Sequence, residues 1–455
     1  MTDLSSVVDE EQFQPKVSPE RLAWGVLLIS FAIFCFICAA STLGVYYFMF
    51  DSSLSLQATL NVGRGTVGVT EGGRTPQAVS GARGIEHHTI VQTDSADYWS
   101  QANIDFIDPN HNQVIASLVV RHDSSIELQN ARRPRFDWSN VNYEVSFGNL
   151  TGQVDLFVFD TTDRPLDVDF SMANGTEIRI NSPGRYLLES VDGEIRLTNW
   201  TGQAVLIAPD RVSAVSIPAG QIGLVDLEGQ ILRYNAPINF LENGDLTTSG
   251  MTQPQAGVIV NDPVAGRWSC THRPNTNLPL GNYFSDLSPD GRDAFRLVRG
   301  GGATTNAQTS CEYSFPEGLD ISNYNFIALQ AAFYLKYHSV NGCGEQGSEC
   351  PMMFKIQYTD VNGIAREWIH GVYYLPFESA QNNWKRRCDT CISDNIRINS
   401  DTWYIYNSDN LFNVIPPDQT PQVINRVIFF AEGHQYDVYI DEIALIADPV
   451  ADESE

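Results

Sequence analysis

The longest apolar run of the chain lies near its N-terminus. From Leu22 to Phe50 the sequence contains 29 residues without a single charged side chain. At a rise of about 1.5 Å per helical residue, this run exceeds the roughly 30 Å hydrocarbon core of a bilayer. Trp24 at one end and Tyr46 and Tyr47 at the other are residue types typical of the membrane–water interface. The pattern predicts a single-pass transmembrane helix over residues 22–50, preceded by a short tail of residues 1–21.

A cleaved signal peptide is the alternative interpretation, because Ala39-Ala40-Ser41 resembles a cleavage site. The length of the run, the acidic residues before it and the apolar residues after the site favour the uncleaved helix. Lys16 and Arg21 precede the helix, whereas the next basic residue after it is Arg64. This bias predicts a cytoplasmic N-terminus, with the rest of the chain extracellular or periplasmic.

From residue 51 to 242 the pattern changes to short alternating runs separated by turn signals. The segments 114–120, 154–159 and 194–197 predict strands, and dipeptides such as Asn174-Gly175 and Asp192-Gly193 predict tight turns between them. No helical periodicity intervenes. We therefore expect an all-β domain over residues 51–242.

Several motifs in this region resemble FecR-type extracytoplasmic domains. They are the stretches 90–96 (IVQTDSA), 104–108 (IDFID), 180–186 (INSPGRY), 191–197 (VDGEIRL), 201–205 (TGQAV) and 217–221 (IPAGQ). The resemblance spans about residues 58–235 and implies a β-rich module outside the membrane. The regulators of that family carry a sizeable cytoplasmic anti-sigma region. Here only the tail of residues 1–21 is available for a cytoplasmic partner, which argues against direct regulation of a sigma factor. A sensor or regulator of signalling is therefore the alternative function and not the favoured one.

A segment rich in Gly, Thr, Gln and Pro follows at residues 243–261 and is typical of a linker. Beyond it the β-pattern resumes with longer strands, at 326–335, 353–358, 427–430 and 436–446. Long strands with turn-rich connections favour a two-sheet β-sandwich or jelly roll over residues 262–448, followed by an acidic tail of residues 449–455. The predicted fold class is therefore mainly β, with one N-terminal helix and two β-domains.

This second β-region resembles the galactose-binding-like jelly rolls of carbohydrate-binding modules. The resemblance rests on the stretches 319–324 (LDISNY), 402–403 (TW), 425–430 (NRVIFF) and 438–443 (VYIDEI). It implies glycan binding, and it makes Asp441 in the closing strand the best candidate ligand for a structural calcium ion. The competing interpretation of Asp441 is an acidic residue on an edge strand, exposed to solvent.

A sugar site needs aromatic faces for stacking and polar groups that reach the hydroxyls. The candidate ligand-binding residues in the second β-region are Trp368, Tyr373, Trp384, Arg386, Trp403 and Tyr406. Each of these aromatic residues has core packing as its competing interpretation.

The eight cysteines are unevenly distributed along the chain. Two lie within the apolar run, and the other six are Cys270, Cys311, Cys343, Cys350, Cys388 and Cys391. Six cysteines allow fifteen pairings, of which spacing suggests 343–350 and 388–391 as small loops, leaving 270–311. The CxxC form of Cys388-Asp-Thr-Cys391 also occurs in redox and zinc sites, but a structural disulfide is favoured because no second ligand pair stands beside it. Three bridges predict an oxidising compartment and support the same orientation of the helix.

Composition narrows the function further. With 28 basic and 55 acidic residues the formal net charge is −27, which argues against nucleic-acid binding and against docking on an anionic membrane surface. No nucleophile elbow, zinc-protease or nucleotide-binding motif is present, so we expect a non-enzymatic protein.

The expected function is that of a membrane-anchored binding protein of a bacterial cell surface. It would recognise a glycan or an envelope component through its jelly roll, alone or as a homo- or hetero-oligomer. An envelope enzyme acting on polysaccharide is a less favoured third interpretation.

Overall fold

The computed structural model describes residues 18–160, 164–244, 246, 268–273, 279–378 and 383–449. The chain divides into two compact units. The smaller unit contains the N-terminal helix and the segment 133–141, and the larger unit contains the β-sheets. Most of the predicted linker and of the two predicted tails lies outside the described residues.

The smaller unit is built around one long helix. Helix α1 (Pro19–Tyr46) begins with proline in its first turn, where the missing N–H costs nothing, and it continues as a π-helical segment, η1 (Tyr47–Asp51). Together they form an apolar helix of 33 residues that is long enough to cross a membrane. None of its side chains is buried, unlike those of a core helix. The predicted helix is therefore confirmed, and an apolar N-terminal helix of this kind serves as a membrane anchor or as a signal sequence.

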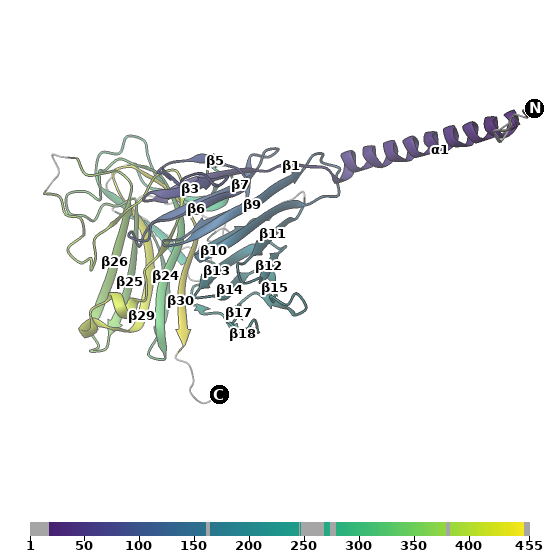
Figure 1. The fold of residues 1–455 in the computed structure, drawn as a ribbon. Coiled ribbons are helices and arrows are strands. Elements are labelled where there is room, and N and C mark those ends of the chain that lie inside the picture. The colour runs from purple at the N-terminus through teal and green to yellow at the C-terminus, as the bar shows by residue number, and fades with distance from the viewer. Residues whose placement is uncertain are drawn as a thin grey trace, which may run out of the picture. The chain divides into compact units, whose positions relative to one another are not determined.

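The larger unit is almost entirely β-structure (Figure 1). A short strand, β1 (Ser53–Ser55), comes first in the chain. The following strands, which we call the N-terminal sheets, pair in two series that share the long strand β10 (Tyr143–Val158). One series has the order β4 (Gln77–Val79), β3 (Val67–Glu71), β6 (Thr89–Gln92), β9 (Ser125–Pro134), β10, β11 (Leu166–Ser171), β12 (Glu177–Ile180), β15 (Gln203–Ile207) and β16 (Ala214–Pro218). The other has the order β5 (Arg83–Ile85), β2 (Gln57–Arg64), β7 (Gln101–Asp108), β8 (Gln113–Val120), β10, β13 (Gly184–Val191), β14 (Glu194–Thr201), β17 (Gln221–Val225) and β18 (Ile231–Asn235).

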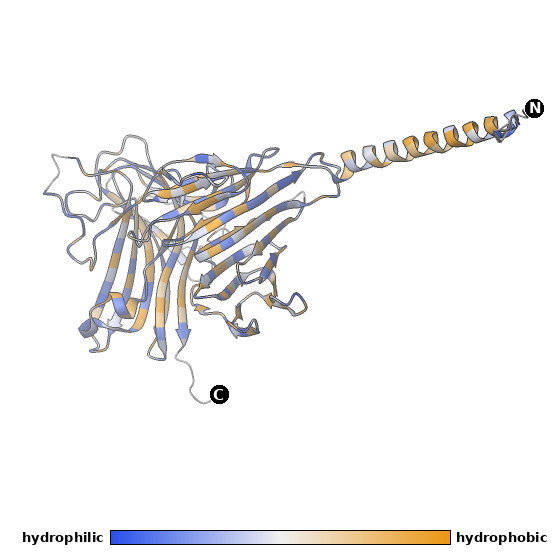
Figure 2. Cartoon of the chain, in the orientation of Figure 1, coloured by the Kyte–Doolittle hydropathy of each residue, from blue (hydrophilic) through white to orange (hydrophobic). Residues whose placement is uncertain are grey.

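The two series pack against each other through one apolar face each. Along the strands, hydrophobic and polar residues alternate, as the colours in Figure 2 show, so that every second side chain enters the core. Phe106 of β7 contacts Phe147 of β10 with ring centroids 5.8 Å apart, and Phe147 stacks on Phe170 of β11 at 5.0 Å. These contacts link the two series across the core.

The remaining strands, which we call the C-terminal sheets, form a second pair of sheets. One has the order β21 (Asn282–Leu287), β22 (Asp293–Arg299), β30 (Tyr436–Pro449), β24 (Tyr324–His338) and β28 (Trp403–Asn407), and β19 (Ile238–Asn239) also pairs with β30. The other has the order β20 (Trp268–Arg273), β23 (Ala307–Asp320), β29 (Pro421–Gly433), β25 (Met352–Asp360), β26 (Ala365–Tyr373) and β27 (Ile396–Arg397). Two single-turn helices, α2 (Leu411–Val414) and η3 (Pro417–Gln419), precede β29.

Large antiparallel sheets with a shared apolar core confirm the predicted mainly β fold and its β-sandwich character. Phe333 of β24 and Phe354 of β25 meet across this core with ring centroids 5.8 Å apart. Because β19 pairs with β30, the chain joins the C-terminal sheets before the predicted linker of residues 243–261 begins. Leu246, within that segment, is also buried in the second core.

Candidate functional site

The N-terminal and C-terminal sheets share a buried polar contact surface, which we call the seam. Strand β7 alternates so that Ala102, Ile104 and Phe106 enter the first core while Gln101, Asn103 and Asp105 occupy the opposite face. On an isolated sheet that second face would be exposed to water, but here its three polar side chains are buried.

Strand β7 recognises the backbone of β28 through these side chains. The Gln101 amide accepts a hydrogen bond from the Ile405 N–H at 2.8 Å and donates one to the Ile405 carbonyl at 3.2 Å. Asn103 Nδ2 donates to the Trp403 carbonyl at 2.5 Å and to Thr402 Oγ1 at 3.2 Å. The pairing holds the two sets of sheets in one compact unit, because buried amides without such partners would be costly.

Ion pairs complete the seam. The guanidinium of Arg292 lies 3.0 Å from Asp105 and 2.7 Å from Asp290, and it contacts the rings of Phe159 and Trp403 at 4.8 and 4.9 Å. Burial raises the pKa of Asp105, and the charge of Arg292 opposes that rise.

A second arginine crosses the seam further along. Arg185 of β13 pairs with Glu442 of β30 at 2.7 Å and donates to Gln330 Oε1 at 3.0 Å. A register shift in the pairing of β30 with β24 places both Asp441 and Glu442 between the core residues Ile440 and Ile443. The bulge therefore presents two carboxylates toward the arginines where regular alternation would present one.

A cleft of about 600 Å³ lies between the two sets of sheets beside the seam. Its aromatic lining comes mostly from the N-terminal sheets, and the C-terminal sheets contribute Phe326, Tyr404 and polar residues of β24, β28 and β30. Its main lining residues are Tyr98, Trp99, Arg121, His122, Gln153, Glu189, Arg196, Trp200, Tyr234, Phe326, Gln330, Tyr404, Asn407 and Asp448. Tyr98 and Tyr234 are 44% and 51% exposed, so aromatic surface is open to a ligand here.

The charged groups of the cleft largely neutralise one another. Arg121 Nε lies 2.6 Å from Asp155, which is fully buried, and Arg196 faces Glu189 at 3.9 Å. Burial alone would lower the pKa of the Arg121 guanidinium, but the Asp155 carboxylate raises it above its usual value. Burial, together with a hydrogen bond to Asp409, raises the pKa of the Tyr98 hydroxyl, so this group stays protonated. The cleft therefore presents arginines paired with carboxylates and a protonated Tyr98 hydroxyl.

Two hydrogen-bond donors of the cleft are buried without a partner among the residues that the structure describes. They are the indole Nε1 of Trp200 and one terminal nitrogen, Nη2, of Arg121. An unpaired buried donor costs about 1–3 kcal/mol.

Four of the six predicted ligand-binding residues are buried in the structure. Trp368, Tyr373, Trp403 and Tyr406 are at most 5% exposed. Tyr406 stacks on Phe354 in the core, and Trp403 packs on Arg292 in the seam. Both faces of β28 are covered, one by the core and one by the N-terminal sheets, so its aromatic residues have no open face.

The other two predicted residues, Trp384 and Arg386, lie on the disulfide loop of residues 383–395. Trp384 is half-buried there and Arg386 is exposed, with its guanidinium 5.8 Å from the Phe377 ring. Neither lines the cleft. The structure thus does not bring the six predicted residues together at one site.

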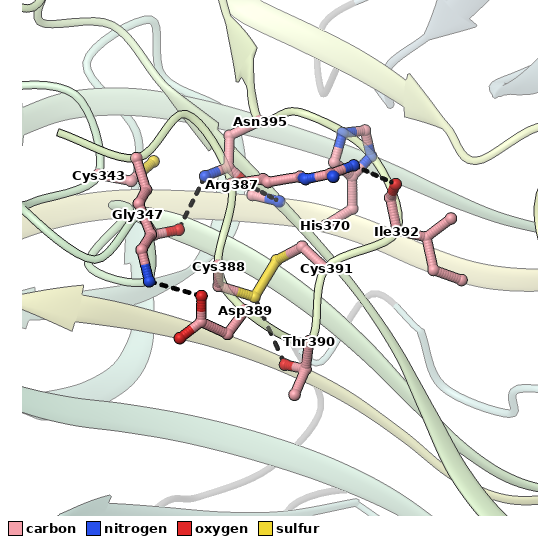
Figure 3. Close-up of a disulfide and its surroundings, with 12 residues drawn as sticks. Cys343, Gly347, His370, Arg387, Cys388, Asp389, Thr390, Cys391, Ile392 and Asn395 are labelled. Carbon is pink, nitrogen blue, oxygen red and sulfur yellow. Dashed lines mark hydrogen bonds and ion pairs between the residues drawn. A yellow bond between two sulfur atoms is a disulfide. The ribbon is translucent and has the colours of Figure 1, made fainter. Parts of the chain in front are cut away.

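The three disulfides join the pairs that the spacing suggests, namely Cys270–Cys311, Cys343–Cys350 and Cys388–Cys391. The two short ones share a small apolar cluster with Met353, Ile369, Tyr373 and Phe430. Figure 3 shows Asn395 beside the Cys388–Cys391 loop, where its side chain donates to the Gly347 carbonyl at 2.9 Å. The loops are therefore held by covalent bonds and by hydrogen bonds around one core, as in a structural disulfide.

The structure places Asp441 in the seam. Burial raises its pKa to about 7, and Arg292 partly opposes the rise. No group of three or more His, Cys, Asp or Glu side chains that could hold a metal ion occurs among the described residues. Calcium binding at Asp441 stays a prediction.

Sequence reasoning missed the cleft because its residues come from strands far apart in the chain. One local signal was present: Arg196, Thr198 and Trp200 alternate on β14 with the core residues Ile195 and Leu197. A tryptophan on the outward face of such a strand indicates a covered or ligand-binding surface.

No protein-family model matches the chain, and no curated protein matches its sequence. Solved structures with some similarity include an anti-sigma factor candidate from Parabacteroides distasonis, at 10% identity and a TM-score of 0.23, covering 32% of this chain. This chain spans 59% of that protein's length. A xylan-binding domain from Paenibacillus barcinonensis has 9% identity and a TM-score of 0.24, with 48% of this chain and 99% of that domain covered. A family 11 carbohydrate-binding module from Clostridium thermocellum has 13% identity and a TM-score of 0.22, with 43% and 94% covered.

Proposed function

We propose that this protein is a membrane-anchored, non-enzymatic glycan-binding protein whose ligand occupies the cleft beside the seam. Helix α1 would hold the chain in the membrane as a single-pass anchor. The β-sheets, which contain three disulfide bonds, would lie outside the cell membrane, because such bonds persist in oxidising compartments.

The observation that carries the proposal is the combination of open aromatic rings and polar side chains in one cleft. Pyranose rings stack their C–H faces on aromatic side chains, and their hydroxyls accept hydrogen bonds. The cleft offers Tyr98, Trp200 and Tyr234 for the first interaction, and polar side chains such as Gln153, Arg196 and Asn407 for the second. Its volume of about 600 Å³ is within the usual range for small-ligand sites.

The charge balance favours a neutral sugar over an anionic one. Each arginine of the cleft already faces a carboxylate, Arg121 with Asp155 and Arg196 with Glu189. A polyanionic glycan would have to displace these carboxylates or add charge beside them. We therefore expect preference for uncharged oligosaccharides.

The test is a glycan array probed with the full-length protein in lipid nanodiscs, with and without calcium. Trp200→Ala is expected to weaken binding of the best glycan about 2- to 13-fold, since an aromatic stacking contact is worth about 0.5–1.5 kcal/mol. Tyr337→Ala is the control, because Tyr337 is an exposed aromatic residue, at 46%, that lies outside the cleft. Absence of binding on the array, or equal weakening by both variants, would contradict the proposal. Turnover of a bound polysaccharide would favour an enzyme instead.

A further inference from the structure

The smaller compact unit contains more than the helix. Segment 133–141, which we call the juxtamembrane loop, belongs to the same unit as α1 although more than eighty residues separate them in the sequence. The structure thus joins this loop to the end of the apolar helix.

Specific contacts fix the loop to the helix end. The ring of Phe136 meets that of Phe48 edge to face, with centroids 5.6 Å apart, and the guanidinium of Arg135 lies 5.0 Å from the Phe48 ring. The backbone N–H of Arg135 donates to the Ser52 carbonyl at 3.1 Å, and its Nε donates to Ser52 Oγ at the same distance.

The loop presents an exposed aromatic surface. Trp138 stacks on Phe136 with ring centroids 4.9 Å apart and an interplanar angle of 8°, yet its side chain is 56% exposed. Trp138, Phe136 and Phe48 are in contact with one another, and a contiguous exposed apolar surface marks a protein or membrane interaction site. Arg133 and Arg135 precede this pair and Asp137 lies between its two residues, so the loop combines aromatic rings with a net positive charge in a chain whose net charge is −27.

The helix sets the depth at which this surface would lie. From Trp24 to Tyr46 the helix rises about 33 Å, at about 1.5 Å per residue, which is close to the roughly 30 Å hydrocarbon thickness. If Trp24 lies at one interface, then Tyr46 lies at the other, and Phe48 follows within the headgroup region. Phe136 contacts Phe48 of this part of the helix, and Trp138 stacks on Phe136.

We infer that the juxtamembrane loop is a second membrane contact, in which Trp138 and Phe136 insert at the headgroup–acyl boundary and Arg133 and Arg135 bind phospholipid phosphates. Tryptophan prefers this boundary, and arginine extends its aliphatic stem so that the charged head reaches the phosphate layer. The inference rests on the anchoring role proposed for α1 but is independent of glycan binding.

The test uses tryptophan quenching in the full-length protein, reconstituted into phosphatidylcholine vesicles with bromine atoms near the top of the acyl chains. Trp24→Phe retains Trp138, Trp138→Phe retains Trp24, and the double variant reports the background from the other six tryptophans. Tryptophan-to-phenylalanine changes keep an apolar ring at each position, so folding should be preserved.

We expect the fluorescence of the Trp24→Phe protein, which retains Trp138, to be quenched more than that of the double variant. This extra quenching should be comparable to the extra quenching of the Trp138→Phe protein, which retains Trp24. If Trp24 is quenched but Trp138 adds nothing, the helix is inserted and the loop does not touch the membrane, which overturns the inference. Crosslinking of the loop to a second copy of the chain would also overturn it. If Trp24 is not quenched either, the anchoring role itself fails, and this outcome is distinct from the first.

Discussion

Asp441 makes the stability of the larger unit depend on pH. Burial in the seam raises its folded pKa to about 7 from an ordinary value of 3.8, although Arg292 nearby opposes the rise. Because the folded state holds this proton more tightly than the unfolded state, the contribution of Asp441 to stability is complete below pH 3.8. It is lost progressively as the pH rises through about 7.

The size of the effect follows from the difference between the two pKa values. A shift of about three units corresponds to about 4 kcal/mol at 1.36 kcal/mol per unit, which is an upper bound. The side chain of Asp441 is only partly shielded from solvent. Screening by water therefore reduces the expected effect on stability to roughly 2 kcal/mol.

Asp441→Asn removes the ionisation while retaining the shape of the protonated acid. The variant is expected to match the wild type at pH 4 and to be more stable by about 2 kcal/mol at pH 8. The assay is thermal or urea unfolding of the full-length protein at both pH values. Asp448→Asn, at the exposed end of the same strand, makes the same charge change and should show no such difference. A constant offset between Asp441→Asn and the wild type across this pH range would refute the reasoning.

Two further predictions concern what holds the sheets together. Arg292→Met should lower the free energy of unfolding by about 3–5 kcal/mol, measured by urea denaturation at neutral pH, because it leaves buried carboxylates without their cation; a loss under 1 kcal/mol would contradict this role. Replacing Cys270 and Cys311 by serine should lower the free energy of unfolding by about 4 kcal/mol, and replacing Cys388 and Cys391 should lower it by about 2 kcal/mol. The reason is that a bridge closing a loop of 41 residues restricts the unfolded chain more than a bridge closing a loop of three. Equal losses would show that strain or local packing outweighs chain entropy.

The classes of structure were predictable because they depend on local periodicity. An uncharged run over 22–50 can form only an apolar helix of this length, and alternation over segments such as 114–120 and 353–358 makes strands with one buried face. The disulfide pairs followed from spacing, because short separations such as 343–350 limit the alternatives.

The site could not be predicted in the same way. Trp403 and Tyr406 have the residue type and neighbourhood expected of a sugar platform, yet covering surfaces bury them from both sides of β28. Which aromatic residue is covered depends on contacts between segments three hundred residues apart, such as Asn103 with Thr402. No local pattern contains that information.

The sequence by itself therefore determined the apolar helix, the β-rich class and the disulfide framework, since each arises from neighbours along the chain. Only the tertiary structure decided that the polar face of β7 becomes a buried seam, that Trp200 and Tyr234 line a cleft, and that Trp138 joins the helix end. The physical reason is that strand alternation specifies which residues share a face, whereas the packing of distant sheets decides what that face meets.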